Sequence, residues 1–250
     1  MSRPPAAETL KRRVRAGEEA FAAGKLTDAA EEWSAALRSA GRLGASGSLK
    51  TTLRNNLAGI YQALGKKAKA RRMYEAALAG ATADLGAESA PVATILNNLA
   101  DLENSSGNPA KAEPLFRKAL AIVEGHSQQR GPLLGLLANM SECLRQLGRL
   151  EEAAQFHSRA LQLAESAGAK PEMLGILWNN AGTIEEERGA HERAAEWYER
   201  AASLLRQAGP AYNRQLQRAM RNQANALRKR AADIEKAAAD LVSGGQTSDG

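Results

Sequence analysis

Residues 85 to 122 read LGAESAPVATILNNLADLENSSGNPAKAEPLFRKALAI, and this stretch decides the fold. Pro91 suits the start of a helix, because the first helical turn leaves its amide hydrogens unpaired and proline has none to lose. Gly107 suits a helix end that needs a positive φ. The stretch therefore predicts a hairpin of two helices, which we call helix A and helix B, with a tight turn at Gly107.

The same features recur along the chain with a period of 41 or 42 residues. A glycine is followed five residues later by an alanine at Gly24/Ala29, Gly65/Ala70, Gly107/Ala112, Gly148/Ala153 and Gly189/Ala194. Nine residues before four of these glycines stands an asparagine: Asn56, Asn98, Asn139 and Asn180. Nine residues after each comes an aromatic residue or histidine, and three residues later an alanine: Trp33/Ala36, Tyr74/Ala77, Phe116/Ala119, His157/Ala160 and Tyr198/Ala201. Five similar helical hairpins are therefore predicted.

Each predicted helix A carries apolar residues on one face. The spacing i, i+4, i+7, i+11 is seen in Leu53, Leu57, Ile60 and Leu64, and again in Leu136, Met140, Cys143 and Leu147. The predicted repeats cover about residues 10–43, 48–84, 91–125, 132–168 and 171–208, after a flexible N-terminus at 1–9. Residues 210–242, with Asn222, Leu227 and Ile234 near the expected offsets, are interpreted as a degenerate sixth helix A that continues into a capping helix, and 243–250 as a disordered tail.

These units resemble tetratricopeptide repeats (TPRs), whose pattern has a small residue in helix A, a turn glycine, an early alanine in helix B, an aromatic residue and a second alanine. The longer period and the LNNLA sequence at residues 96–100 are more specifically similar to the repeats of kinesin light chains. One hairpin cannot bury its own apolar face, so neighbouring hairpins must stack. The resemblance implies an all-α fold: a right-handed superhelical solenoid of about five TPR repeats with a C-terminal capping helix, in which helices A line a concave channel.

The channel wall is predicted to be rich in carboxamides. The candidate peptide-binding residues are Asn55, Asn56, Asn97, Asn98, Asp101, Asn139, Glu142, Arg145, Asn179 and Asn180. An asparagine side chain has the donors and the acceptor of a peptide group, so a ladder of asparagines can pair with the backbone of an extended peptide. The resemblance implies ligand contact for Asn56, Asn98, Asn139 and Asn180, and less directly for Asn222. The alternative is that these amides satisfy buried polar groups between helices.

We expect a non-enzymatic adaptor or scaffold that binds an extended segment of a protein partner. A self-assembling module that associates through its terminal helices, and so forms a homo-oligomer, is one alternative. Nucleic-acid binding by the basic segment QLQRAMRNQANALRKR at residues 215–230 is a weaker one, because this segment lacks aromatic residues for base stacking. The first repeat has Val14, Arg15 and Glu18 where chaperone-binding TPR relatives hold a carboxylate clamp, so chaperone tails are not expected as ligands.

Composition excludes several other classes. Hydrophobic residues make up 44% and charged residues 25% of the 250-residue chain, and 52 residues are alanine, as in a helical globular protein. The formal charge of +6 is concentrated at the two ends of the chain. No run of about 18 apolar residues predicts a membrane span, and no secretory signal is evident, so we expect a cytoplasmic protein.

Catalysis, metals and cofactors are also not expected. Cys143 is the only cysteine, and it falls in a core column of the repeat. His157 and His191 fall in packing columns, and the histidines show no metal-binding spacing. Asp101 and Glu103 point to different sides of a helix, and residues 41–50 lack the signature of a phosphate-binding loop.

Overall fold

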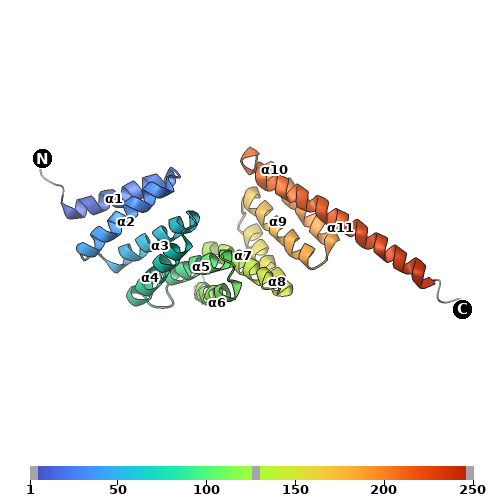
Figure 1. Ribbon diagram of the computed structural model, residues 1–250, viewed down its shortest axis with the longest axis horizontal. Helices are drawn as coiled ribbons and strands as arrows, with labels where there is room; N and C mark the ends of the chain where they lie inside the picture. Colours follow the sequence, from blue (N-terminus) through green and yellow to red (C-terminus); the bar gives the residue numbers. More distant parts are fainter. Residues whose placement is uncertain (1–4, 126–129, 246–250) are drawn as a thin grey trace. The chain divides into compact units, whose positions relative to one another are not determined.

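The computed structural model describes the backbone of residues 5–125 and 130–245 and the side chains of residues 5–125 and 132–240. Within these ranges the chain is all-α and contains no strand (Figure 1). The helices are α1 (Ala6–Ala22), α2 (Leu26–Arg42), α3 (Gly47–Ala63), α4 (Lys67–Leu85), α5 (Ala90–Ser105), α6 (Pro109–Gly125), α7 (Arg130–Gln146), α8 (Leu150–Ser166), α9 (Pro171–Glu187), α10 (His191–Gln207), the 3-10 helix η1 (Pro210–Tyr212) and α11 (Asn213–Gly245). The predicted all-helical repeat fold is confirmed.

The chain divides into two compact units. The N-terminal unit, Met1–Leu136, holds α1 to α6 and the first part of α7, and the C-terminal unit, Leu137–Gly250, holds the rest of α7 and α8 to α11. In both units the odd-numbered helices are helices A and the even-numbered helices are helices B. No helix in the described part of the chain is long and apolar enough to cross a membrane.

The five predicted turn glycines all adopt a positive φ. Their φ values lie between 71° and 81° at Gly24, Gly65, Gly107, Gly148 and Gly189. At the first turn, the Lys25 N–H donates to the Ala20 carbonyl over 2.9 Å, and the Gly24 N–H donates to the Phe21 carbonyl over 2.9 Å. These bonds satisfy carbonyls that the helix end would otherwise leave unpaired. The glycine is therefore needed at each turn for its backbone conformation.

The two alanine columns form the contact between helices of each hairpin. All ten members have an exposed fraction of 0%: Ala29, Ala70, Ala112, Ala153, Ala194, Ala36, Ala77, Ala119, Ala160 and Ala201. The residues of the aromatic column are at most 4% exposed. A Cβ atom placed on Gly182 of α9 would lie 2.7 Å from the Tyr198 ring on α10, so a glycine stands where that ring crosses the helix. Small residues let the backbones approach closely, as the repeat pattern predicts.

Cys143 and His157 are core residues, as predicted. Cys143 is fully buried, and His157 is 3% exposed with its Nε2 atom 2.8 Å from the Leu177 carbonyl. The packing assignment of His191 misses a polar contact, because its Nδ1 atom lies 2.6 Å from a carboxylate oxygen of Asp233 on α11. His191 and Asp233 are 42 residues apart in the sequence, and the repeat columns do not predict their contact.

The terminal helices are longer than predicted. α1 begins at Ala6, inside the predicted flexible N-terminus, and α11 reaches Gly245. The remainder of the predicted tail, residues 246–250, lies outside the described residues, as do residues 1–4. With 33 residues, α11 is much longer than the helices of 16 to 19 residues that form the repeats.

Candidate peptide-binding groove

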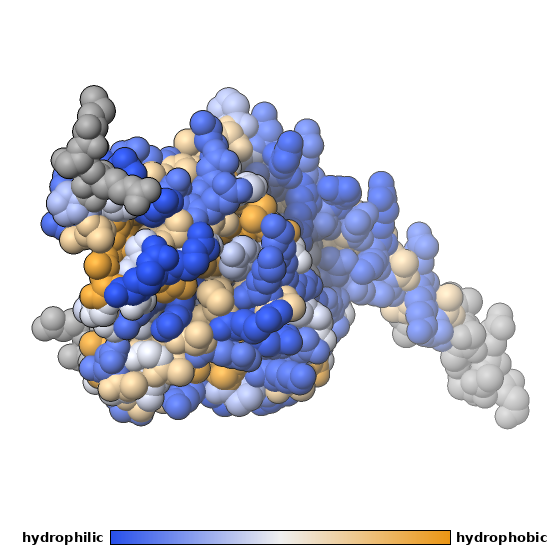
Figure 2. All heavy atoms as spheres, turned by 60° about the vertical axis from the view of Figure 1, so that its left-hand side comes forward, coloured by the Kyte–Doolittle hydropathy of each residue, from blue (hydrophilic) through white to orange (hydrophobic). Residues whose placement is uncertain are grey.

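The N-terminal unit contains a groove of about 580 Å³ formed by its first four helices and α5. Its lining residues are Glu18, Phe21, Trp33, Asn55, Asn56, Gly59, Ile60, Ala63, Tyr74 and Asn98. Three of the ten predicted site residues, Asn55, Asn56 and Asn98, therefore lie together in one groove. Figure 2, in which this unit comes forward, shows apolar patches between hydrophilic side chains on its surface.

One side of the groove is apolar. Phe21 of α1 is 52% exposed, and its ring centroid lies 5.8 Å from that of Trp33 on α2. The Trp33 Nε1–H donates to the Val14 carbonyl over 3.1 Å, which fixes the indole against α1. Phe21 was not among the predicted site residues. It is an aromatic residue on a helix A, outside the aromatic column of helices B, and this position could have indicated a contact other than the repeat core. An exposed ring beside a groove is an available contact for an apolar ligand group.

The other side of the groove carries the asparagines. The Asn98 Nδ2 atom of α5 donates to the Asn55 Oδ1 atom of α3 over 3.1 Å, and Asn97 donates to Asn98 over 3.5 Å. Asn56 is partly buried, and its side-chain amide makes no hydrogen bond to the described part of the chain. The hydrogen bond between Asn98 and Asn55 thus joins consecutive helices A. This role is close to the alternative prediction that the amides satisfy buried polar groups between helices, although the partner is another side-chain amide and not a backbone group.

Asp101 is held next to the groove by a short polar network. The Gln62 Nε2 atom donates to the Asp101 carboxylate over 2.7 Å, and the Tyr74 hydroxyl donates to the Gln62 Oε1 atom over 3.3 Å. Burial, and secondly the charge of Asp101, raises the pKa of Tyr74 to about 12. Tyr74 therefore stays a neutral donor. Gln62 and Tyr74 were not among the predicted site residues.

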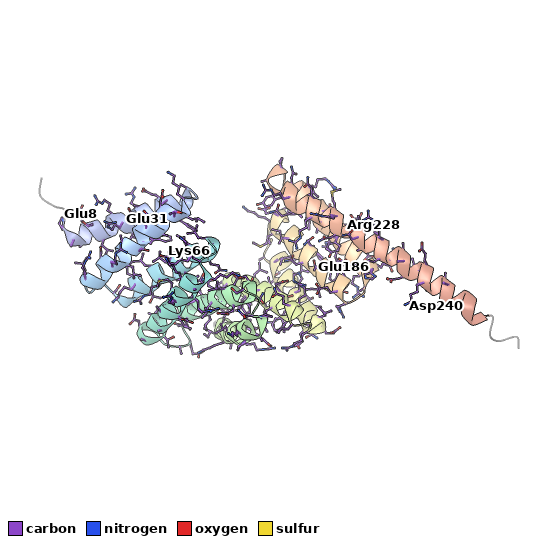
Figure 3. All side chains as sticks on the ribbon, in the orientation of Figure 1. Glu8, Glu31, Lys66, Glu186, Arg228 and Asp240 are labelled. Carbon is purple, nitrogen blue, oxygen red and sulfur yellow. The ribbon has the colours of Figure 1, made fainter. Side chains whose placement is uncertain are left out.

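The C-terminal unit repeats the asparagine contact. Asn222 of α11 donates to Asn179 of α9 over 3.2 Å, and Asn179, which is 6% exposed, donates to the exposed Asn180 over 3.5 Å. On the same helix, Glu186, which is labelled in Figure 3, accepts from the Tyr198 hydroxyl over 2.8 Å and from Lys229 of α11 over 2.6 Å. Burial opposes ionisation of Glu186, but these two donors outweigh it and lower its pKa.

The predicted residues Glu142 and Arg145 of α7 form an ion-pair network. Arg145 donates to both Glu142 carboxylate oxygens, over 2.9 and 2.7 Å, and also to Glu187 of α9. Burial raises the pKa of Glu142, but the hydrogen bonds from Arg145 and Gln146 outweigh it, and the net shift is downward. Asn139 is partly buried on the same helix, three residues before Glu142. This unit therefore presents a charged surface where the N-terminal unit presents amides and an aromatic ring.

The described residues contain no group of three histidine, cysteine or acidic side chains that could hold a metal ion. In the basic segment on α11, two of the five basic residues contact acidic side chains: Lys229 contacts Glu186 over 2.6 Å, and Arg230 contacts Glu192 over 2.5 Å. Lys229 and Arg230 therefore form ion pairs within the chain.

Comparison with known proteins agrees with the repeat structure. The tetratricopeptide repeat family profile matches residues 48–125 and 133–207. No curated protein matches the sequence.

Solved structures of low sequence identity share the fold. BtubC (BKLC) from P. vanneervenii is 21% identical with a TM-score of 0.65, over 81% of this chain and 91% of BtubC. A kinesin light chain protein from Podospora anserina with nearly identical TPR-like repeats is 15% identical with a TM-score of 0.66, over 83% and 99% of the two chains. PlcR from Bacillus thuringiensis, solved with the peptide PapR7 and DNA, is 14% identical with a TM-score of 0.59, over 78% and 70%. The family profile covers more than half of the sequence, and the chain belongs to the tetratricopeptide repeat family.

Proposed function

We propose that the chain is a non-enzymatic adaptor that binds an extended peptide segment of a partner protein, with the groove of the N-terminal unit as the anchoring site. The observation that carries this proposal is the juxtaposition, in one groove of about 580 Å³, of an exposed aromatic ring and partly buried amides. Binding sites combine apolar surface with a few convergent polar groups in this way.

The apolar side of the groove receives a hydrophobic side chain of the peptide. Phe21 provides this surface, and the Trp33 ring packs against the Phe21 ring. Phe21 is already half exposed in the free chain, so a ligand covers apolar surface without any helix having to move.

The amides hold the peptide backbone. Asn56 has both N–H groups and its carbonyl oxygen available for a ligand, as far as the described residues are concerned. Asn98 uses one N–H for Asn55 and keeps the other. In this reading Asn55 and Asn97 set the orientation of Asn98, and Asn56 and Asn98 make the contacts.

The C-terminal unit has candidate polar contacts of its own. Asn139 and Asn180 occupy the repeat positions of Asn56 and Asn98, and the Glu142–Arg145 pair adds charge beside them. Asp101 and Asn179 act through their neighbours Gln62 and Asn222. The fold is shared with PlcR, whose structure contains the peptide PapR7, and with the quorum sensor NprR, which supports a peptide-binding role.

The test uses peptides selected on the intact chain. A display library of random peptides is panned against the full chain, and enriched peptides are synthesised and titrated by fluorescence anisotropy. Asn56→Ala removes hydrogen bonds worth about 1 kcal/mol, so we expect the affinity to fall about fivefold. Phe21→Ala removes the apolar surface and weakens binding further.

The matched control is Gln155→Ala, because Gln155 is an exposed amide on α8, a helix B. Its affinity for the peptides should equal that of the unmodified chain. If Asn56→Ala and Phe21→Ala both bind the selected peptides as tightly as the unmodified chain does, the groove is not the peptide site.

A further inference from the structure

One face of α11 carries an exposed apolar stripe. Met220, Leu227 and Ile234 are 48%, 45% and 59% exposed and stand seven residues apart. Ala224, Ala231 and Ala238 lie between and beyond them and are also exposed. The stripe therefore has alternating steps of four and three residues, which is the spacing of a two-stranded coiled coil.

The corresponding positions in the preceding repeats are buried or partly buried. The repeat period places Ala224 in the column of Ala100, Ser141 and Gly182. These three residues are small, and all three are buried. Helix B of the same repeat covers that column: the Tyr198 ring lies over Gly182, and the Ser141 hydroxyl donates to the Ala153 carbonyl over 2.8 Å. Met220 falls in the column of Leu96, Leu137 and Trp178, of which the two leucines are 2% exposed and Trp178 is partly buried. In α11 these columns lack a covering helix among the described residues.

The stripe is separate from the face by which α11 joins the repeats. Ala219 and Ala226, both 0% exposed, pack against α10, and Asn222 and Asp233 bond to α9 and α10. At about 100° per residue, the stripe lies roughly a third of a turn from that face. Beyond these contacts, residues 231–240 are all exposed, and α11 extends past α9 and α10 as far as Asp240 and further (Figures 1 and 3).

We propose that the stripe is a dimerisation surface, and that its occupant is the α11 helix of a second copy of this chain, packed antiparallel. Large and small residues then alternate across the contact, with Leu227 opposite Ala238 and Ala231 opposite Ile234 of the second copy. Such pairs let two helices approach closely and leave no gap. A parallel pair would place Leu227 on Leu227 and alanine on alanine, which leaves the alanine layers unfilled.

Charge selects the same arrangement. In the antiparallel register, Arg228 of each copy lies beside the stripe opposite Glu235 of the other, so that the dimer contains this attractive pair twice. Both residues are exposed on α11, on the side of the stripe away from α10 (Figure 3 labels Arg228). The stripe thus complements itself in shape and in charge, which is the reason to assign it to a second copy.

The first test is the mass of the full chain in solution, measured by sedimentation equilibrium over a range of concentrations. We expect twice the chain mass of 26.6 kDa. The double variant Leu227→Glu/Ile234→Glu should have the mass of one chain, because it buries charge in the contact. The matched control Ala232→Glu/Ala239→Glu places the same charges on exposed positions of α11 outside the stripe and should remain a dimer.

Circular dichroism checks that all variants keep the helical content of the unmodified chain. A monomer at every concentration, or a dimer that persists in Leu227→Glu/Ile234→Glu, would overturn the proposal. The groove of the N-terminal unit is untouched by these changes, so peptide binding should be the same in the monomeric variant. The failure of either proposal is thereby distinguishable from the failure of the other.

The second test addresses the register. Arg228→Glu and Glu235→Arg each replace two attractive pairs with two repulsive ones, and each should weaken the dimer about tenfold at low salt. The double variant Arg228→Glu/Glu235→Arg restores opposite charges in the antiparallel pair and should regain the original dissociation constant. In a parallel pair the arginine introduced at position 235 would lie beside Arg230 of the other copy, so a double variant that is as weak as the single variants overturns the antiparallel arrangement.

Discussion

Asn222 donates to Asn179 over 3.2 Å in the C-terminal unit, and Asn98 donates to Asn55 over 3.1 Å in the N-terminal unit. In both pairs the donor comes 43 residues after the acceptor, on the next helix A. In each of these two pairs, an asparagine of one repeat accepts a hydrogen bond from an asparagine on the following helix A. This amide contact fixes the register between neighbouring helices A.

Replacing Asn179 tests the structural half of this arrangement. Asn179→Ala leaves the partly buried Asn222 amide without its acceptor, so we expect the free energy of unfolding to fall by about 1–2 kcal/mol. Urea denaturation followed by circular dichroism measures the change. Asn225→Ala, at an exposed position on α11, should shift it by less than about 0.5 kcal/mol. Equal effects of the two substitutions would show that the amide contact adds nothing.

Gly182 tests the close approach of α9 and α10. In Gly182→Ala the new Cβ atom would lie 2.7 Å from two Tyr198 ring carbons, and because Tyr198 is 1% exposed the ring has little room to move. We expect a loss of about 1–3 kcal/mol. Gly135→Ala on α7 is the control, since a Cβ there meets nothing within 4 Å. It should be neutral or stabilise by up to about 1 kcal/mol, because alanine favours a helix over glycine. A neutral Gly182→Ala would contradict the packing described.

His157 makes stability depend on pH. Burial lowers its pKa, against opposing effects of the Leu177 carbonyl and Glu142. Below the ordinary histidine pKa of 6.5 the unfolded chain takes up a proton that the folded chain refuses, so stability is lost as the pH falls. His157→Phe, which places the aromatic residue of the third repeat at this position, should reduce the loss. Urea midpoints at pH 7.5 and 5.5 measure it, and an identical loss in both proteins would rule out His157 as its source.

Arg71 and Glu103 test an ion pair that joins α4 to α5. Arg71 donates to the two Glu103 oxygens over 2.5 and 2.9 Å, and the Glu103 side chain is 7% exposed. Arg71→Ala leaves this carboxylate nearly buried with Asn108 as its remaining donor, and should cost about 2 kcal/mol, less than a fully buried pair because Arg71 is 40% exposed. Adding Glu103→Leu removes the stranded charge and should recover at least part of that stability. A double variant less stable than Arg71→Ala would contradict this account.

The repeat columns could be predicted because each has one physical reason that holds in every copy. The turn glycines need a positive φ, and the alanine columns need small side chains where helices cross. The boundaries of the hairpins follow from these columns to within a few residues. The length of α11 was harder to predict, because this helix lacks the turn glycine and the aromatic residue of the repeat. The repeat pattern also does not indicate where a helix longer than one repeat ends.

The candidate site could be predicted only in part. Asn55, Asn56 and Asn98 lie together because they occupy fixed positions on consecutive helices A. Phe21 was not predicted, since the first repeat departs from the pattern and its aromatic residue belongs to no column. Contacts such as Gln62 with Asp101, or His191 with Asp233, depend on side-chain conformations and on which helices are neighbours. A repeat period contains no information about either.

The complete burial of both alanine columns has a consequence for how this chain can change over generations. Any larger side chain at those ten positions would push two helices apart, so they tolerate almost no variation. Phe21 and the asparagines that line the groove lie outside these columns, whereas Trp33 and Tyr74 belong to the aromatic column. Mutations can therefore exchange one ligand for another while the scaffold stays as it is, and a duplicated hairpin brings its own complete set of helix contacts with it.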